Sequence, residues 1–288
     1  MSCEWNLGGV GMKHAVVIII VLVFAVIGFL AISKKTSPAK ALPQDFSKDY
    51  SNEIVAYLGC EYEIIQNAED VSIVMEKYKP LLFRGRSEGF TPIVIVPSSI
   101  MYEVINDEDK HNDHDYRTEA IIEKSRAINV TELLNGRIAD ASPSEEEKDC
   151  DIMGEYSKAD PVNSFASLID YNTNRPYATI IIAKIPTTNP WELAAWIPMG
   201  GFNECPSPEE QVAVFKYWYE KYGAVPAVVS DETWELYVEK PVKTKDEAMS
   251  LALEQFGFCD DIVWQGVGKV NALAGVLVDS SVWSFWWD

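Results

Sequence analysis

Carboxylates are the side chains in the C-terminal third of this sequence that are best suited to chemistry. A pair of carboxylates between aromatic side chains is typical of glycoside hydrolysis, and a convergent group can hold a metal ion that activates water. The candidates are Glu204, Asp231, Glu254, Asp260, Asp261 and Asp288. The simpler interpretation is that Asp231 and Asp261 cap turns and helices, Glu254 faces solvent and Asp288 is the end of the chain. We favour this interpretation and predict no metal site and no catalytic residue among them.

Nucleophilic catalysis has less support in this region. A Ser or Cys nucleophile needs a base within hydrogen-bond reach, and residues 177–288 contain no His. Cys205 in NECP and Cys259 in FCDD have no cationic neighbour in the sequence, so packed thiols are the simpler interpretation. The sequence contains no G-x-S-x-G, GxGxxG or P-loop motif. We therefore expect no cofactor and lean towards a protein that is not an enzyme.

The segment NDEDKHNDHD, residues 106–115, offers another set of metal-binding side chains. It contains His111 and His114, spaced at i and i+3, among four Asp and one Glu. A calcium loop of the EF-hand type, counted from Asp107, would need Gly and Glu where Asn112 and Thr118 stand. A solvated acidic loop is the simpler interpretation, and we adopt it.

Tryptophan is concentrated in the C-terminal third of the chain. All but Trp5 of the nine Trp lie between residues 185 and 288. A large aromatic side chain buries roughly 150 to 250 Å², so this density predicts the main core. Because the Trp come without a catalytic constellation, we also predict a non-catalytic surface that recognises another macromolecule. Its expected residues are Trp191, Trp196, Asn203, Glu204, Asp260 and Trp286.

The elements that must position these residues follow from periodicity and capping signals. YATIIIAKI, residues 177–185, is β-branched and apolar, as expected of a strand buried on both faces, and WELAAWIP predicts a second strand. SPEE, residues 207–210, predicts a capped helix that ends at Gly223. The remaining expected elements are strands at VPAVVS and TWELYVEKP and helices over 244–256 and 269–278.

The last expected strand is VWSFWWD. Alternation places Trp283, Phe285 and Trp287 on one face and Ser284 and Trp286 on the other. Both faces carry a Trp. We therefore expect this strand either to be covered on both sides or to carry a binding surface on one.

Residues 45–140 alternate between helix and strand, which predicts a small α/β layer. The expected elements are a helix ending at Gly59, a strand CEYEIIQ, a helix EDVSIVMEKYKPLL ending near Pro80, a strand over 93–96, a short helix opened by Ser98 or Ser99, and a helix over 118–134. Residues 141–176 form an acidic connector, which we expect to be mobile between the two halves. The fold class is α+β, with a mixed sheet flanked by helices.

Residues 15–32, AVVIIIVLVFAVIGFLAI, form an uncharged apolar run. At about 1.5 Å per residue this run is just long enough to cross a hydrocarbon core of about 30 Å. It predicts one transmembrane helix between an N-terminal tail, residues 1–14, and a linker, residues 33–44, and hence a single-pass protein of the cell membrane. A cleaved secretory signal is the alternative. The flanking lysines give conflicting cues, so the side of the membrane on which the soluble part lies stays open.

Charge limits the range of partners. With 24 Lys and Arg against 44 Asp and Glu, the formal net charge is -20. Such a chain repels phosphate backbones, so nucleic acid is not an expected partner. The simpler interpretation of this net charge is a solvated surface, and the more specific one is attraction to a basic protein. The five Cys include no CxxC pair, and the disulfide state of Cys60, Cys150, Cys205 and Cys259 stays open.

Four stretches carry a family resemblance: NPWELAAWIPMGGFNECPSPEEQ, YWYEKYGAVPAVVSDETWE, EQFGFCDDIV and WSFWWD. Together they resemble the bacterial family known as domain of unknown function 4253, over residues 177–288 and more loosely from about residue 45. The resemblance implies an α+β domain without an established activity. Members look like intracellular proteins, so the apolar run at 15–32 is a departure. Some families of small acidic bacterial proteins neutralise toxins, and by analogy the resemblance allows an immunity-like role.

These features predict a membrane-anchored protein whose Trp-rich domain at 177–288 recognises a protein partner without chemistry of its own. The alternative is a carboxylate-dependent hydrolase or a carbohydrate-binding enzyme. A deep pocket that holds two of the named carboxylates between aromatic walls would favour the alternative.

Overall fold

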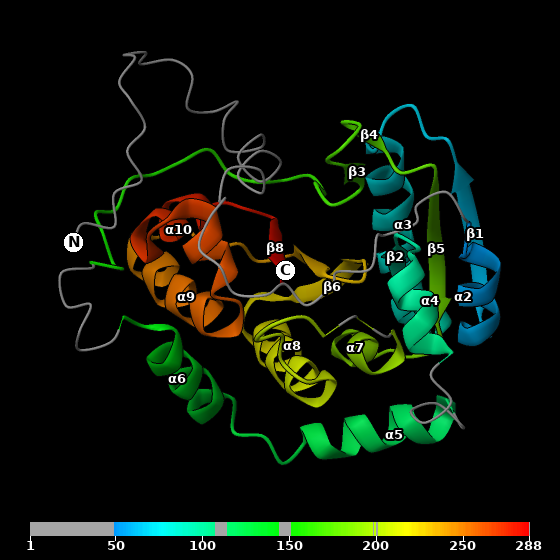
Figure 1. The fold of residues 1–288 in the computed structure, drawn as a ribbon, viewed down its shortest axis with the longest axis horizontal. Helices are drawn as coiled ribbons and strands as arrows, with labels where there is room; N and C mark the ends of the chain where they lie inside the picture. The colour runs from blue at the N-terminus through cyan, green and yellow to red at the C-terminus, as the bar shows by residue number, and fades with distance from the viewer. Residues whose placement is uncertain (1–48, 107–113, 144–150, 198, 200, 288) are drawn as a thin grey trace, which may run out of the picture. The chain divides into compact units, whose positions relative to one another are not determined.

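A six-stranded mixed sheet organises the computed structural model, which describes residues 49–106, 114–143, 151–197, 199 and 201–287 (Figure 1). Its strands are β1 (Glu61–Gln66), β2 (Thr91–Ile95), β5 (Thr179–Ile185), β6 (Ala224–Val229), β7 (Thr233–Val238) and β8 (Val282–Trp286). They lie in the order β1-β5-β2-β6-β7-β8, and β2 pairs parallel to β6 while the other neighbours are antiparallel. The short strands β3 (Ile169–Asp170) and β4 (Arg175–Pro176) form a separate hairpin. The predicted α+β class with a mixed sheet is confirmed.

The central strands β5, β2 and β6 are rich in Ile, Val and Ala and are buried on both faces. This burial confirms the expectation for YATIIIAKI and for the strand over 93–96. In the sheet, β2 lies between β5 and β6. Strands from both sides of the predicted connector at 141–176 therefore share one sheet.

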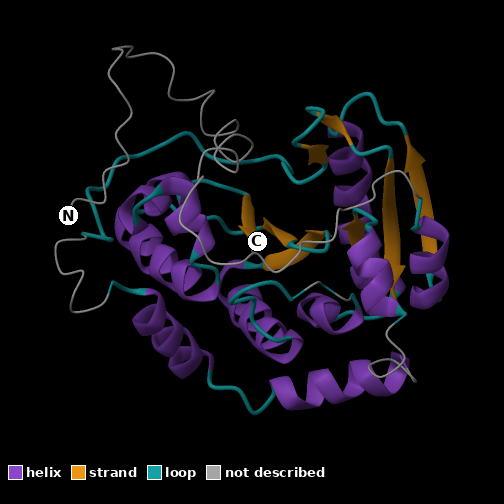
Figure 2. Cartoon of the chain, viewed as in Figure 1, coloured by secondary structure: helices purple, strands orange, loops and turns teal. Residues whose placement is uncertain are grey.

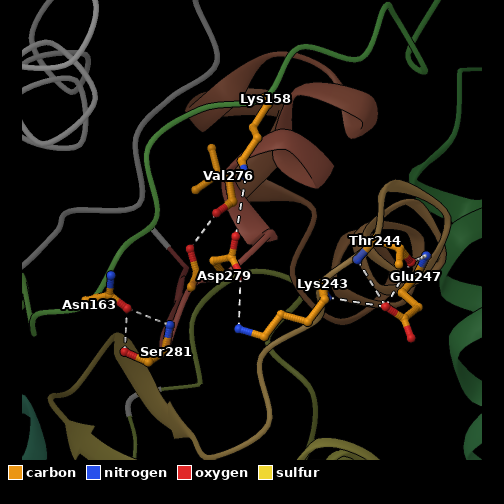
Figure 3. Close-up of polar contacts among 9 residues, drawn as sticks. Lys158, Asn163, Lys243, Thr244, Glu247, Val276, Asp279 and Ser281 are labelled. Atoms are coloured by element: carbon orange, nitrogen blue, oxygen red, sulfur yellow. Dashed lines mark hydrogen bonds and ion pairs between the residues drawn. The ribbon is translucent and has the colours of Figure 1, made fainter.

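The two helices with the strongest start signals form where the sequence predicts them. Each begins with a capping box, in which the N-cap hydroxyl accepts from a backbone N–H and the third helical residue's carboxylate accepts from the N-cap N–H. They are α8 (Pro208–Tyr222) with Ser207 and Glu210, and α9 (Lys245–Phe258) with Thr244 and Glu247 (Figure 3). Helix α8 ends at Gly223, whose φ of 63° is the left-handed conformation that glycine adopts readily.

Aromatic side chains of α8 pack on β7 and β8 and form the main core. The ring of Trp218 stacks on Phe285 with 5.3 Å between centroids and meets Trp283 edge-on at 5.7 Å. Phe215 meets Trp234 edge-on at 5.5 Å. None of these five side chains is more than 2% exposed. The Trp density of the sequence therefore marks the core, as predicted.

The alternation expected along the last strand is confirmed. Trp283, Phe285 and Trp287 are buried, whereas Ser284 and Trp286 on the other face are half-buried. That second face is not bare, because the Ser284 hydroxyl donates to the buried carboxylate of Glu235 at 3.0 Å.

Three helices come from residues 49–106, the first part of the region that was expected to form a small α/β layer, and two of them, α2 and α3, flank strands of the sheet (Figure 2). They are α2 (Ser51–Leu58), α3 (Ser72–Glu88) and α4 (Ser99–Ile105). Helix α2 ends at Gly59, and the Ser98 hydroxyl caps α4 by accepting from the backbone N–H of Met101, both as predicted.

Helix α3 is longer than predicted, and the expected end near Pro80 is wrong. The helix continues through Pro80 to Glu88. A proline inside a helix removes one hydrogen bond and costs about 3 kcal/mol. Val74, Tyr78 and Leu82, on both sides of Pro80, are buried. Burial of this continuous apolar face offsets the cost of the proline.

The segment WELAAWIP is helical, and the strand predicted there is wrong. It forms a 3-10 turn, η3 (Pro190–Glu192), followed by α7 (Leu193–Trp196). Pro190 occupies the first helical position, where a missing N–H removes no hydrogen bond. The Leu and Ala residues that follow favour helix, and these signals outweigh the apolar character that suggested a strand.

Two helices, α5 (His114–Ser125) and α6 (Val130–Ala141), replace the single helix expected over 118–134. At the C-terminal end of α5, the backbone N–H groups of residues 126, 127 and 128 each donate to the carbonyl three residues earlier. Bonds of this type tighten the last turn of a helix and end it. Asn129 precedes Glu132 by three residues, a spacing typical of a helix start that the sequence already contains.

Residue contacts divide the chain into two compact units. Of the described residues, the sheet unit comprises 49–106, 114–130, 163–197, 199, 201–240 and 281–287, and it contains the six-stranded sheet with α2, α3, α4, α5, α7 and α8. Of the described residues, the helical unit comprises 131–143, 151–162 and 241–280. It contains most of α6, α9, the π-helical turn η4 (Ile262–Val267) and α10 (Val270–Leu277).

Residues 151–162, expected within a mobile connector, are packed on α10 in the helical unit. Carbonyl groups of this segment accept hydrogen bonds from the backbone N–H groups of Val270 and Asn271 at 3.0 and 2.9 Å. The N–H of Ala159 donates to the carbonyl of Gly275 at 3.1 Å. The first N–H groups of a helix lack partners within the helix, and this segment supplies them for α10. Residues 151–162 are therefore held against α10 by backbone hydrogen bonds.

We expect the substitution Gly275→Ala to destabilise the helical unit by about 1 to 3 kcal/mol through steric overlap. The added Cβ would lie 1.9 Å from the carbonyl oxygen of Ser157, so residues 151–162 would have to leave α10. Thermal unfolding and the rate of protease cleavage within 151–162 measure the effect. The control is Gly136→Ala in α6, where nothing lies within 4 Å of the added Cβ. Equal cleavage rates in the two variants would contradict the close packing.

The predicted membrane segment at 15–32 lies outside the described residues, as do the tail at 1–14 and the linker at 33–44. Within the ranges that the structure does describe, no helix has the length and apolar character needed to cross a membrane.

Candidate functional site

The residues predicted for recognition are distributed over several elements. In chain order, Trp191 lies in η3, Trp196 ends α7, Asn203 and Glu204 lie in the loop before α8, Asp260 precedes η4, and Trp286 ends β8. The three Trp are half-buried and the loop residues are exposed. All of them belong to the sheet unit except Asp260, which belongs to the helical unit.

A groove in the sheet unit contains one of these residues, Trp191. The groove has a volume of about 350 Å³ and is open to solvent. Its walls come from the end of α5 and the residues after it, from η3 and from α8. The lining residues are Ile122, Ser125, Arg126, Ile128, Val130, Asn189, Trp191, Glu192, Ala213, Lys216, Tyr217 and Glu220. We call this surface the Trp191 groove.

A hydrogen-bond network fixes the turn that carries Trp191. The carboxylate of Glu192 accepts from the Thr187 hydroxyl at 2.6 Å and from the Asn189 side-chain amide at 2.9 Å. The backbone N–H of Asn189 donates to the same hydroxyl at 3.1 Å. The ring of Trp191 packs against Tyr219 of α8 with 5.0 Å between centroids. The indole is therefore held in place before any ligand arrives, which lowers the entropy lost on binding.

Helix α8 supplies the second wall of the groove from the face opposite its core. Lys216, Tyr217 and Glu220 follow the buried Ala213 at helical spacing, and all four line the groove. Lys216 and Glu220 form a long ion pair of 3.8 Å, and the Lys221 ammonium donates to the Tyr217 hydroxyl at 3.1 Å. Exposed pairs of this kind contribute little to stability, so these charges can pair with a ligand instead.

The third wall is the C-terminal end of α5 with the residues that follow it. Ile122, Ile128 and Val130 give it apolar surface, and Arg126, which pairs with Glu123, adds charge at the rim. The Ser125 hydroxyl donates to the carbonyl of Ile122 at 2.7 Å. The groove thus has apolar and aromatic side chains among charges of both signs, the composition of a binding surface.

The carboxylates considered for chemistry are not assembled into a site of this kind. Glu204 is exposed, Glu254, Asp260 and Asp261 lie in the helical unit, and Asp288 lies outside the described residues. Asp231 is buried, and burial raises the pKa of its carboxyl despite a hydrogen bond from Ser98. Over the described part of the chain, no three His, Cys, Asp or Glu side chains are placed to hold a metal ion. The loop with His111 and the side chain of His114 lie outside the described residues.

The cysteines considered as nucleophiles lie in packed surroundings. Cys259 is buried and Cys205 is half-buried. The loop that contains Cys205 is anchored by Gln211, whose side-chain amide donates to the carbonyl of Pro206 at 2.8 Å and accepts from the Trp234 indole N–H at 2.8 Å. These contacts support the interpretation of Cys205 as a structural residue.

Most of the Trp191 groove was not predicted from sequence. The helical spacing that identified the core stripe of α8 also places Lys216, Tyr217 and Glu220 on its opposite face, so one signal was present. The second signal, the proximity of α5 to that face, is not local, because α5 and α8 are far apart in the chain.

The C-terminal part of the chain matches a known protein family. The family model described as "Domain of unknown function (DUF4253)" matches residues 181–288. This match confirms the resemblance drawn from the sequence. No curated protein and no solved structure matches the chain.

Proposed function

We propose that the protein, whose residues 181–288 match the DUF4253 family model, is a non-catalytic module that binds another protein through the Trp191 groove. The observation that carries the proposal is a half-buried Trp on a turn fixed by hydrogen bonds, within an open groove lined by apolar, aromatic and charged side chains. Aromatic anchors of this type contribute a large share of the binding energy in protein interfaces.

The geometry of the groove supports binding over catalysis. None of the carboxylates considered for chemistry lines it. Of the two carboxylates that do, Glu192 already accepts hydrogen bonds at both oxygens from Thr187 and Asn189, and Glu220 lies beside Lys216. This arrangement favours a protein partner over the carboxylate-dependent hydrolase that was the alternative.

Charge and the N-terminal sequence support two further parts of the proposal. The formal net charge of -20 favours a basic partner, and long-range attraction would speed association. The apolar run at 15–32 would tether the protein to the membrane as a single-pass anchor. An immunity-like role, in which the partner is a toxic protein, is one form of this proposal.

We expect Trp191→Ala to reduce partner binding by at least tenfold, which corresponds to about 1.4 kcal/mol. The experiment is an affinity capture from native membranes with the tagged full-length chain, followed by measurement of the dissociation constant with the purified partner. Added salt should weaken the complex if the partner is basic.

The matched control is Tyr171→Ala, because Tyr171 is 59% exposed in the sheet unit but does not line the groove. This variant should bind like the wild type. Equal dissociation constants for Trp191→Ala and the wild type, or the absence of any stoichiometric partner, would contradict the proposal.

A further inference from the structure

Glu235 is a fully buried carboxylate in the middle of β7. It is 0% exposed and forms no ion pair with any described residue. Its oxygens accept hydrogen bonds from the backbone N–H groups of Ala166 at 2.8 Å and Ser167 at 3.3 Å, and from the hydroxyls of Ser167 and Ser284. All of its donors therefore come from β8 and from one short segment, residues 163–168, which we call the strap.

The strap covers one face of β7 and β8 and is attached at three points. At its start, the Asn163 side-chain oxygen accepts from the backbone N–H of Ser281 at 3.1 Å and from its hydroxyl at 2.6 Å (Figure 3). In its middle, Phe165 is 3% exposed and packs edge-on against Tyr78 of α3, with 5.6 Å between ring centroids. The third attachment is the carboxylate of Glu235. Of the three, only Glu235 can change its charge.

Closure of the strap buries polar groups at a cost. The hydroxyl of Tyr78, beneath Phe165, is buried without a hydrogen-bond partner among the described residues. An unpaired buried hydroxyl costs roughly 1 to 3 kcal/mol relative to a hydrated one. A buried carboxylate without a cation is costly in the same way. Opening the strap would hydrate both groups, which offsets part of the cost of exposing the buried side chains of Phe165 and Leu168.

The elements packed around Glu235 offer no cation to neutralise it. The strap, β6 and β8 contain no titratable side chain. From α3, the titratable side chain of Tyr78 packs edge-on against the rings of Phe165 and Tyr237. Along β7, the ring of Tyr237 lies under the Lys79 ammonium at 5.3 Å, and Glu239 just beyond the strand pairs with Arg86. These cations are thus engaged elsewhere, and burial raises the pKa of Glu235 despite hydrogen bonds from Ser167, Ala166 and Ser284.

We propose that the strap is a pH-sensitive latch, closed over β7 and β8 when Glu235 is protonated and released as Glu235 ionises. Release separates Phe165 from Tyr78 and exposes both rings. The latch lies outside the Trp191 groove, because neither Glu235 nor any strap residue lines the groove.

The sign of the pH dependence follows from linkage. Glu235 has a raised pKa with the strap closed and returns towards its ordinary value of 4.5 when the strap opens. The closed state therefore binds the proton more tightly than the open state. Closure is most stable at pH values below 4.5, the ordinary pKa of the carboxyl. Above that pH, the equilibrium constant for closure falls by up to about tenfold per pH unit, until the pH exceeds the raised pKa of Glu235.

Hydrogen exchange of the Ala166 and Ser167 amides tests the latch, since both amides donate directly to Glu235. In the full-length protein, their protection factors, corrected for intrinsic exchange, should fall by up to about tenfold per pH unit above 4.5. The reference is the amide of Val96, which donates to the carbonyl of Val229 at 2.9 Å and not to Glu235. Its protection should not follow the same pH profile.

Two variants separate titration of Glu235 from a general loss of structure. Glu235→Gln removes the titrating group, and protection at Ala166 and Ser167 should lose its pH dependence. Because the Gln amide would face backbone N–H donors, this variant can also hold the strap less tightly. Ser284→Ala keeps the carboxylate but removes one donor to it, which should move the profile to higher pH. Three results would overturn the proposal. The first is wild-type protection at Ala166 and Ser167 that is constant or rises with pH. The others are a pH dependence that persists in Glu235→Gln and a pH profile that does not shift in Ser284→Ala.

Discussion

A fragment that starts at residue 177 is expected to remain unfolded, although it contains the whole region that matches the DUF4253 family. In the sheet, β5 pairs with β1 on one side and with β2 on the other, and both partners lie upstream of the fragment. The fragment therefore keeps β5 without either neighbour and removes the parallel partner of β6. Far-UV circular dichroism and a thermal scan of the fragment measure the outcome.

The control for this experiment is a chain that starts at residue 49, which retains all six strands. It should unfold in a cooperative transition. A cooperative transition of similar midpoint in the fragment from residue 177 would contradict the strand order described for the sheet. The region recognised by the family model would then be an independent folding unit.

The substitution Trp218→Ala is expected to lower the free energy of unfolding by about 3 to 5 kcal/mol. Trp218 is 0% exposed, and its ring contacts both Phe285 and Trp283 of β8. Removal of the indole leaves a cavity between α8 and the sheet. Urea unfolding followed by circular dichroism measures the loss.

Phe83→Ala is the matched control for Trp218→Ala. Phe83 lies on α3 in the same unit and is 57% exposed, so its removal creates no cavity. Its loss should change the free energy of unfolding by less than about 0.5 kcal/mol. A similar loss of stability in the two variants would show that the α8 aromatic cluster is not the principal core.

Elements with strong local signals could be predicted from the sequence. The capping boxes at Ser207 and Thr244 fix the starts of α8 and α9 because their hydrogen bonds involve neighbouring residues alone. Alternation in VWSFWW gives the two faces of β8 because the period of a strand is two wherever it is placed. These local rules need no knowledge of the partners.

Errors arose where distant contacts decide the structure. Pro80 does not end α3 because the residues on both sides of it are buried by packing. Residues 151–162 have no periodicity of their own, yet they pair with the backbone at the start of α10, more than a hundred residues away. Glu235 would be assigned to a solvated face by alternation along TWELYV, and the strap buries that face. None of these contacts leaves a local trace in the sequence.

In the candidate site too, the part with a local sequence signal could be predicted and the parts that depend on distant contacts could not. The NPWE turn was chosen from sequence for its Trp, although as part of a strand, and Trp191 lines the groove. The other walls depend on α5 lying beside α8, a contact between remote segments. Asn203 and Glu204 are exposed but do not line the groove, and Asp260 belongs to the helical unit.

Photo-crosslinking from the groove is the most direct test of the central claim that this surface binds a protein. A photoreactive phenylalanine analogue replaces Tyr217, a half-buried wall residue, in full-length protein within cells, and the same analogue replaces Tyr171 as the control position. The account predicts one discrete protein adduct from position 217 that is lost when Trp191→Ala is added, and no such adduct from position 171. No adduct from position 217, or the same adduct from both positions, would contradict it.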